Sequence, residues 1–319
     1  MHITVVIVNF NAGNHLKDCL LSIARQHRPP DRCLIIDNHS LVHPLKGTEA
    51  WLRGAELVSL KENVGFAAAN NLAVTLCPEA DWIALLNPDA YPEPDWLFHL
   101  EEATRRHPQD VVFACRQLST RMKNCLDGAG DGLTRAGRPF RRGFGRPDEA
   151  SYLESDQVFS SCGAATFIKR SVFEALGGFD EDFFCYLEDV DLGFRLRLQG
   201  YGCRYLPQAK VHHEGSALSG HQSDFATYHG HRNLEWVFFK NMPLPLLFLY
   251  LPQHLLLMII SFIICLRRGQ GRIILLAKWD ALKGARKNLL KRSRIQHQRK
   301  ISIVDLWQAL TPERGPWRQ

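Results

Sequence analysis

Oxygen-bearing side chains follow three apolar, strand-like runs in the N-terminal half of the sequence. Asn9 follows the first run, Asp37 closes the second, and Asn87 and Asp89 flank a proline after the third. A carboxylate such as Asp37 can accept hydrogen bonds from a base or a ribose, and it can equally form an Asx turn that only ends the strand. Asp89 could bind a hard divalent cation together with substrate phosphate, although a capped turn explains a single carboxylate equally well.

Acidic residues are crowded among aromatic ones between Gly177 and Leu192. Carboxyl groups near apolar rings tend to have raised pKa values, which suits a general base. Glu188 and Asp189 are the candidates for this role. The alternative is that the acids only favour the N-terminus of a helix predicted over residues 187–198.

His213 belongs to the sequence His212-His213-Glu214, which follows a strand predicted over residues 205–211. Imidazole is a frequent metal ligand, and Glu214 could orient the ring. Two neighbouring histidines are also common on exposed surfaces without any such role.

Alternating strands and helices are expected to position these side chains. The predicted strands are residues 3–8, 32–37, 82–86 and 160–168, and the predicted helices are residues 15–26 and 64–76. The first three strands, which alternate with helices, indicate βαβ units with a parallel sheet, and ligands bind such sheets at the carboxyl ends of the strands. Residues 119–157 are rich in Gly, Arg and Asp without a clear period, which predicts a loop or a small excursion over the site.

Taken in order, these segments resemble family 2 glycosyltransferases, in particular their bacterial rhamnosyltransferase-like branch. The resemblance covers residues 2–240. The matching pieces are Val8-Asn9-Phe10-Asn11, Ile36-Asp37-Asn38-His39-Ser40, Glu62-Asn63-Val64-Gly65-Phe66-Ala67-Ala68-Ala69-Asn70-Asn71, Leu86-Asn87-Pro88-Asp89, Gly163-Ala164, the block 177–195, Gly200-Tyr201 and His213-Glu214-Gly215-Ser216. Each piece is weakly specific alone, whereas the ordered set is highly specific.

The resemblance implies an α/β protein with the A-type glycosyltransferase fold, a Rossmann-like nucleotide-binding sheet fused to an acceptor half. It implies that Asp37 binds the pyrimidine base and that Asn9 belongs to the nucleotide pocket. Asn63, Gly65 and Asn70 match the loop and helix that lie near ribose and diphosphate.

The resemblance also implies a metal and a base. Asp89 occupies the last position of the family's DxD metal motif, and Asn87 stands at its first position, where it lines the donor site without a charge. His213 matches the late metal ligand, so Mg²⁺ or Mn²⁺ is the implied cofactor. Asp189 matches the general base, with Glu188 as the alternative.

The implied reaction inverts the configuration of a sugar. Asp189 would take the proton from an acceptor hydroxyl, whose oxygen would displace a nucleoside diphosphate from the opposite face of the donor sugar. The donor would be dTDP-rhamnose or a UDP-sugar. The acceptor would be a hydroxyl of a glycan or of a lipid-linked glycan in cell-surface polysaccharide synthesis.

Charge divides the chain into two parts. Residues 236–300 contain 13 Lys or Arg and one acid, whereas the rest holds 26 basic and 32 acidic residues. We expect a glycosyltransferase domain over residues 1–240 and a helical tail over residues 241–319 that binds an anionic membrane surface. Nine cysteines without a CxxC pair, and no basic stretch before the first apolar run, favour a reducing cytosol. The expected location is therefore the cytoplasmic face of the bacterial inner membrane.

Residues 243–266 are almost wholly apolar and approach the length of a membrane span. Pro245, Pro252, Gln253 and His254 argue against a simple lipid-exposed helix. An in-plane helix, a re-entrant hairpin, a buried helix pair and an oligomer interface all stay open.

Two other functions compete with sugar transfer. One is a catalytically inactive scaffold protein that binds nucleotide sugars at the membrane. The presence of Asp37, Asp89, Asp189 and His213 together argues against it. The other is nucleic-acid binding through the basic tail, which the adjacent apolar run and the lack of a recognised nucleic-acid module disfavour. No nucleic-acid partner is therefore expected.

Overall fold

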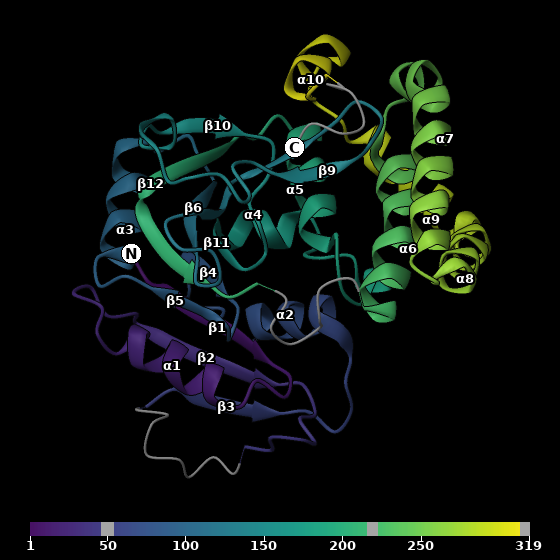
Figure 1. The fold of residues 1–319 in the computed structure, drawn as a ribbon. Helices are drawn as coiled ribbons and strands as arrows, with labels where there is room; N and C mark the ends of the chain where they lie inside the picture. The colour runs from purple at the N-terminus through teal and green to yellow at the C-terminus, as the bar shows by residue number, and fades with distance from the viewer. Residues whose placement is uncertain (46–53, 216–222, 313–319) are drawn as a thin grey trace.

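A ten-stranded sheet forms the centre of the protein, whose computed structural model describes residues 1–45, 54–215 and 223–312 (Figure 1). Its main hydrogen-bonded path runs β10-β12-β6-β11-β4-β1-β2-β3, with β5 paired to β12 and β7 paired to β6. The strands are β1 (Ile3–Asn9), β2 (Arg32–Asp37), β3 (Glu56–Ser59), β4 (Trp82–Leu86), β5 (Ala90–Pro92), β6 (Val112–Ser119), β7 (Leu126–Ala129), β10 (Asp156–Val158), β11 (Ala165–Lys169) and β12 (Cys203–His213). A separate hairpin consists of β8 (Asp131–Leu133) and β9 (Pro139–Arg141).

The first strands of the sheet are parallel, as the sequence predicts. β1 pairs in parallel with β2 and β4, and Asn9 lies directly opposite Asp37. β11 runs antiparallel between β4 and β6, so the complete sheet is mixed. The prediction of a parallel sheet is therefore confirmed for β1, β2 and β4, whereas β11, for which no direction was predicted, runs antiparallel.

Helices cover both faces of the sheet. α1 (Asn14–Ile23) and α3 (Trp96–Arg106) pack on one face, and α2 (Gly65–Thr75), α4 (Arg170–Ala175) and α5 (Glu188–Leu198) pack on the other. Successive side chains of β1 point to opposite faces of the sheet. Val5 and Ile7 therefore lie in the core beneath α1, and Val6 and Val8 lie in the core beneath α2.

The C-terminal helices pack together beside this sheet (Figure 1). They are α6 (Asp224–Asn241), α7 (Leu244–Arg267), α8 (Gly271–Lys283), α9 (Ala285–His297) and α10 (Ile303–Ala309). A third apolar core joins them to α5 and contains Phe194, Phe238 and Leu247. α7 has 24 residues and a mean hydropathy of 2.1, which is long and apolar enough to cross a membrane by those criteria alone.

Two predicted segments differ from the structure. The strand predicted over residues 160–168 begins only at Ala165. Residues 160–164 make hydrogen bonds to groups other than the neighbouring strands β4 and β6. Gly163 N–H, for example, donates to Asp189. The excursion predicted over residues 119–157 contains β7 to β10 and the short 3-10 helix η2 (Ala150–Tyr152). These strands are three or four residues long, too short to produce a periodic pattern.

Candidate functional site

Asp37 and Asn9 form a buried pair at the carboxyl ends of β2 and β1. Asn9 Nδ2 donates to Asp37 Oδ1 at 2.7 Å, and the Ser40 hydroxyl donates to the same oxygen at 2.5 Å. Within the described residues no hydrogen bond is found for Asp37 Oδ2 or for the buried Asn9 Oδ1. This strand end therefore keeps two acceptor oxygens for a ligand.

Asn63 and Gly65 shape the loop before α2. Asn63 Oδ1 accepts hydrogen bonds from Asn38 Nδ2 at 2.8 Å and from Gly65 N–H at 2.9 Å. Gly65 has a φ of +86°, and a Cβ there would lie 2.6 Å from the Phe184 ring. Glycine is therefore required for the close approach of this loop to the acidic segment that carries Asp189.

Asn70 and Asn87 are placed differently from each other. Asn70 Nδ2 donates to the Phe66 carbonyl within its own helix, so this side chain has a local structural partner. Asn87 follows β4, and its Oδ1 is buried without a hydrogen-bond partner in the described part of the chain. An unpaired buried acceptor is unusual and favours a ligand at this position.

Asp89 and His213 are brought together by the pairing of β12 with β5, in which His213 lies opposite Ala90. His213 Nε2 lies 3.4 Å from Asp89 Oδ1 and makes no well-formed hydrogen bond to any described residue. Its other nitrogen, Nδ1, is hydrogen-bonded to Asp127 Oδ2 at 2.7 Å. A buried imidazole with one nitrogen held by a carboxylate and the other facing Asp89 fits a divalent cation.

The two carboxylates set the protonation of this imidazole. Burial opposes the charged form, but the hydrogen bond to Asp127 and the nearby carboxylate of Asp89 raise the pKa of His213 to about 9. Burial also opposes the charge of Asp127, and His213 and Arg141 nevertheless hold its pKa below the usual value. A cation bound at Nε2 would replace the proton there. The two carboxylates would therefore stabilise either a protonated imidazole or a neutral imidazole with a bound cation.

The orienting carboxylate was not the expected one. Glu214 lies next to His213 in sequence, but its carboxylate lies 3.4 Å from His15 Nδ1. Asp127 of β7 takes the orienting position instead, because β7 pairs with β6 beside β12. Ser216, the last residue of that motif, lies outside the described residues.

Asp189 and Glu188 begin α5 and have different surroundings. Asp189 Oδ2 accepts from Gly163 N–H at 2.7 Å, and its Oδ1 accepts from Val190 N–H at 2.8 Å. Burial raises the pKa of Asp189, while these N–H groups and Arg141 oppose the rise. Burial and the charge of Asp189 raise the pKa of Glu188 well above its usual value, and Glu188 Oε2 has no partner among the described residues. Asp189 is therefore the better carboxylate at neutral pH.

The turn before α5 is strained. Phe184, Tyr186 and Leu187 have φ values of +63°, +71° and +65°, a region that non-glycine residues rarely occupy. Asn233 of α6 holds this turn, because its Nδ2 donates to the carbonyls of Phe183, Cys185 and Tyr186 at 3.0, 2.9 and 2.7 Å. Strain kept in place by surrounding bonds is typical of functional sites.

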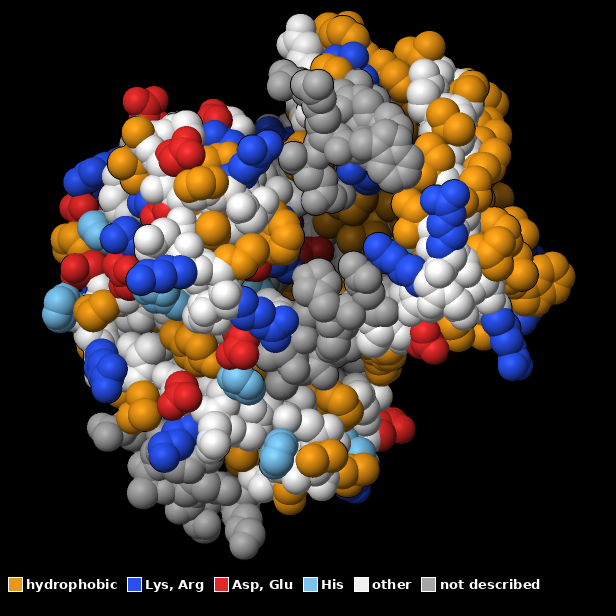
Figure 2. All heavy atoms as spheres, viewed as in Figure 1, with side chains coloured by type: hydrophobic (Ala, Val, Ile, Leu, Met, Phe, Trp, Pro, Cys, Tyr) orange, Lys and Arg blue, Asp and Glu red, His pale blue; other side chains and the backbone are white. Residues whose placement is uncertain are grey.

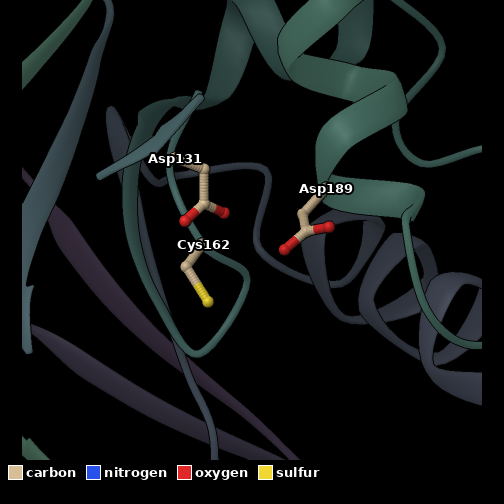
Figure 3. Close-up of side chains that lie close together, drawn as sticks. All are labelled: Asp131, Cys162 and Asp189. Carbon is tan, nitrogen blue, oxygen red and sulfur yellow. The ribbon is translucent and has the colours of Figure 1, made fainter. Parts of the chain in front are cut away.

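Asp131 and Cys162 face Asp189 (Figure 3). One possible ligand atom of each residue lies within 4.8 Å of those of the other two. Both oxygens of Asp189 already accept backbone hydrogen bonds, and Arg141 supplies positive charge to Asp127, Asp131 and Asp189. Burial raises the pKa of Asp131 to about 8. We therefore interpret this group as an acidic pair with Arg141 beside it, not as the metal site.

Arg141 lies near both groups of predicted site residues. Arg141 Nη1 donates to Asp127 Oδ2 at 2.5 Å, and the same oxygen bonds His213. The predicted residues Asp89, His213 and Asp189 therefore lie in one region, where Arg141 is hydrogen-bonded to Asp127 and exerts its charge on Asp189. Asp127, Asp131 and Arg141 of this region were missed because they lie in the aperiodic excursion. Their only signal was the position of that segment between two motifs.

Other acids of the block 177–192 have structural partners. Asp191 accepts from Arg195 Nε at 2.8 Å, and Asp180 and Asp191 lie 2.5 and 2.7 Å from Lys240 Nζ. Asp182 pairs with Lys291 at 2.6 Å. These residues join α5 and its preceding loop to the C-terminal helices and leave Glu188 and Asp189 for chemistry.

Family comparison places most of this architecture in a known group. The sequence profile of the family described as Glycosyl transferase family 2 matches residues 4–177. A second profile, Glycosyl transferase family group 2, matches residues 147–267. The first match covers β1 to β11, and the second covers α5, β12, α6 and α7.

Similar curated proteins include several rhamnosyltransferases. The N-acetylglucosaminyl-diphospho-decaprenol L-rhamnosyltransferase of Mycobacterium tuberculosis is 27% identical over 254 residues, which are 70% of this chain and 80% of that protein. The rhamnosyltransferase WbbL of Escherichia coli is 29% identical over 45% of this chain and 58% of its own length. The O-antigen chain rhamnosyltransferase WbaN of Salmonella anatum is 26% identical over 66% and 65%.

Solved structures share the fold at low identity. GalNAc-T7, solved with UDP, GalNAc and Mn²⁺, superposes with a TM-score of 0.60 at 16% identity over 75% of this chain and 48% of that chain. Staphylococcus aureus TarS 1–349 with UDP gives a TM-score of 0.54 at 14% identity over 80% and 71%. These likenesses confirm the A-type glycosyltransferase fold.

Proposed function

This chain belongs to glycosyl transferase family 2. From this premise we propose that the site at the carboxyl ends of its β-strands transfers a sugar from a nucleotide donor to a glycan hydroxyl with inversion. The chain is a glycosyltransferase by family. Rhamnosyltransferases among its relatives support dTDP-rhamnose as the donor, and a UDP-sugar is the second choice.

Donor binding is assigned to the ends of β1, β2 and β4. Asp37, with Asn9 behind it, offers an acceptor oxygen to the base of the nucleotide. The Asn63–Gly65 loop and the unpaired oxygen of Asn87 line the sugar and diphosphate side, and Asn70 supports the helix beside them. These residues bind and orient the donor.

Asp89 and His213 would hold Mg²⁺ or Mn²⁺ against the donor. The bound ion would act as a Lewis acid that neutralises the charge developing on the leaving diphosphate. Asp127 fixes the His213 ring so that Nε2 faces Asp89. The positive side chain of Arg141, bonded to Asp127, lies between this pair and the base.

Asp189 is proposed as the general base. Its carboxylate is held in one orientation by Gly163 N–H and Val190 N–H, so it can accept the acceptor's hydroxyl proton without first reorganising. The acceptor oxygen attacks the anomeric carbon, the bond to the nucleoside diphosphate breaks, and the proton stays on Asp189. One displacement inverts the configuration.

The convergence of Asp189 and Asp89 on one region carries this proposal most directly. Asp131 lies near Asp189, Arg141 and His213 share Asp127, and His213 faces Asp89, although these residues are scattered over the chain. Figure 2 shows a hollow between the sheet and the C-terminal helices, which gives an acceptor a path toward this region.

The acceptor is proposed to be lipid-linked. The M. tuberculosis relative is named for a sugar carried on decaprenyl diphosphate, which supports a polyprenyl-linked glycan as substrate here. Such a substrate lies in a membrane. An anionic membrane surface as partner, and the cytoplasmic face of the inner membrane as location, follow as parts of the same proposal.

A donor screen tests the function. The purified full chain with Mn²⁺ should be stabilised by dTDP-rhamnose or one UDP-sugar, measured by thermal melting, and should transfer that sugar to a polyprenyl-diphosphate-linked acceptor. Asp37→Asn should weaken the stabilisation by nucleotide at least tenfold. If no nucleotide sugar is bound or turned over with any such acceptor, the proposal is wrong.

A further inference from the structure

α7 has one apolar face that nothing in the described chain covers. Phe248 is 68% exposed and Ile259 is 57% exposed, values far above those of core residues. The exposed apolar residues of the helix are Leu244, Phe248, Leu249, Leu255, Leu256, Ile259, Ile263 and Leu266. Only 11% of its most apolar window is buried, so α7 is not the core helix of the C-terminal part.

The opposite face of α7 is fixed to the rest of the protein at its middle. His254 is completely buried; its Nδ1 is hydrogen-bonded to the Ala136 carbonyl at 2.7 Å, and its Nε2 to Glu235 at 3.0 Å. The His254 ring also stacks on Phe238 with centroids 3.8 Å apart. Ala136 belongs to the turn between β8 and β9, so the middle of α7 is bound directly to the part that carries Asp131 and Arg141.

Such contacts are incompatible with α7 crossing a bilayer. A spanning helix needs about 20 residues in the hydrocarbon, which would place His254 near its centre. The groups around His254 would then lie at the same depth in the bilayer. They are Glu235, the Lys278 side chain that pairs with Glu235, and the β8–β9 turn. Polar loops of this kind are not tolerated in lipid, so α7 can contact a membrane with its exposed side only.

α8 extends the uncovered surface. Leu275, Leu276, Trp279 and Leu282 are between 48% and 67% exposed, and they recur at the spacing of one helix face. α7 and α8 pack against each other, and Figure 2 shows apolar side chains gathered over both, along the edge that faces away from the sheet. We call these residues, with the exposed residues of α7, the α7–α8 face.

Basic residues border this face. Arg267, Arg268 and Arg272 are exposed in and beside the turn between α7 and α8, and no ion pair is found for them within the described residues. Other cations of the C-terminal part are used internally, such as Lys240 and Lys291 with Asp180. The three arginines therefore remain available for anionic headgroups, which each cation attracts.

We propose that the α7–α8 face lies in the plane of an anionic membrane, with its apolar side chains in one leaflet and the arginines on the headgroups. The enzyme is then attached from one side without crossing. Attachment of this kind does not depend on which sugar the protein transfers, so a failed donor screen would not count against it.

Vesicle flotation tests the attachment. The full chain should float with vesicles that contain phosphatidylglycerol and bind vesicles of phosphatidylcholine alone at least tenfold less. The double variant Trp279→Glu with Leu282→Glu should lose at least tenfold of the binding. Leu153→Glu, at an exposed leucine of the catalytic part, is the matched control and should bind normally. Melting curves should show that all variants fold.

A topology measurement separates lying on the membrane from crossing it. In bacterial cells, fluorescent reporters that mature only in the cytoplasm should be active on both the N-terminus and the C-terminus of the full chain. Reporters on opposite sides would overturn the proposal, as would normal vesicle binding by the double variant. Lipid-independent dimers that this variant abolishes would also overturn it, because the face would then be an interface between copies.

Discussion

At the residue scale, the two neighbouring acids at the start of α5 divide their roles by environment. Asp189 accepts two backbone hydrogen bonds, whereas Glu188 is buried with an unpaired oxygen. The sequence predicted both positions but could not choose between them, because the choice depends on Gly163, a residue brought in from another loop.

Asp189→Asn should lower kcat by about 10² or more, the scale of a lost general base, while nucleotide binding survives. Glu188→Gln should have a much smaller effect, because burial raises the pKa of this carboxyl group and an amide has nearly the same shape. Initial rates with a saturating donor measure both. Equal losses in the two variants, or a nearly active Asp189→Asn, would contradict the assignment.

Asp127 illustrates what sequence reasoning misses at this scale. It lies 86 residues from His213, in a segment without periodicity, and Glu214 is the obvious neighbour in sequence. Only the pairing of β7 with β6 brings Asp127 under the imidazole. A motif can supply a ligand such as His213, but the partner of the ligand comes from the fold.

Asp127→Asn should weaken Mn²⁺ binding about 10- to 100-fold, the usual effect of removing the carboxylate behind a metal-bound histidine. Manganese titrations followed by thermal melting provide the measurement. Glu214→Gln is the control, since its carboxylate faces His15, and it should titrate like the unaltered chain. A normal manganese affinity in Asp127→Asn would argue against His213 as a ligand.

At the element scale, long apolar runs were predictable and short strands were not. β1, β2, β4 and α2 match their predicted ranges within one residue at each end, because burial of whole faces imposes a pattern on them. β7, β8 and β9 are held by contacts such as Arg141 with Asp127, which leave no pattern in the sequence. The strained turn before α5 was equally invisible, because α6 imposes it.

Asn233→Ala should disturb this turn by removing three hydrogen bonds to backbone carbonyls. The expected loss of stability is about 1–3 kcal/mol for the buried groups left unpaired, and kcat should fall more than donor affinity. Melting and initial-rate measurements are compared with those of Asn288→Ala in α9, whose amide donates to Gly284. Unchanged kcat in a folded Asn233→Ala would show that the turn does not control the base.

At the scale of the whole molecule, buried charges join the sheet to the C-terminal helices. Lys240 is 1% exposed and lies between Asp180 and Asp191. Burial would raise the pKa of both carboxyls, but the charge of Lys240 holds both below the usual value. The sequence shows that residues 236–300 are basic and that the rest of the chain is mildly acidic. Only the packing shows that some of these opposite charges form buried ion pairs between the two parts.

These lowered pKa values make the assembly sensitive to acid. The stability they contribute is complete above the unfolded pKa of about 3.9 and is lost as pH falls further, so the melting temperature should drop steeply below about pH 4. Lys240→Met should cost up to about 3–5 kcal/mol at pH 7, because it removes the cation that two buried carboxylates share and leaves Asp180 with Lys291 and Asp191 with Arg195. In that variant, acidification from pH 7 to pH 5 should raise the melting temperature.

Calorimetry across this pH range measures how the melting temperature depends on pH in the unaltered chain and in Lys240→Met. Lys210→Met, which removes a half-exposed partner of Glu93, is the control and should keep the pH dependence of the unaltered chain. A Lys240→Met chain with that same dependence would show that the buried charges are not coupled as described.

The hydrogen bonds from Asn233 to the turn before α5 also affect the order in which parts of the site can form during synthesis. Asn233 lies between 47 and 50 residues downstream of the carbonyls it holds. During synthesis from the N-terminus, the strands to which donor binding is assigned emerge before the segment that fixes the proposed base. The proposed base is therefore fixed in place only once residue 233 has been made, so a chain that ends before it should lack transfer activity.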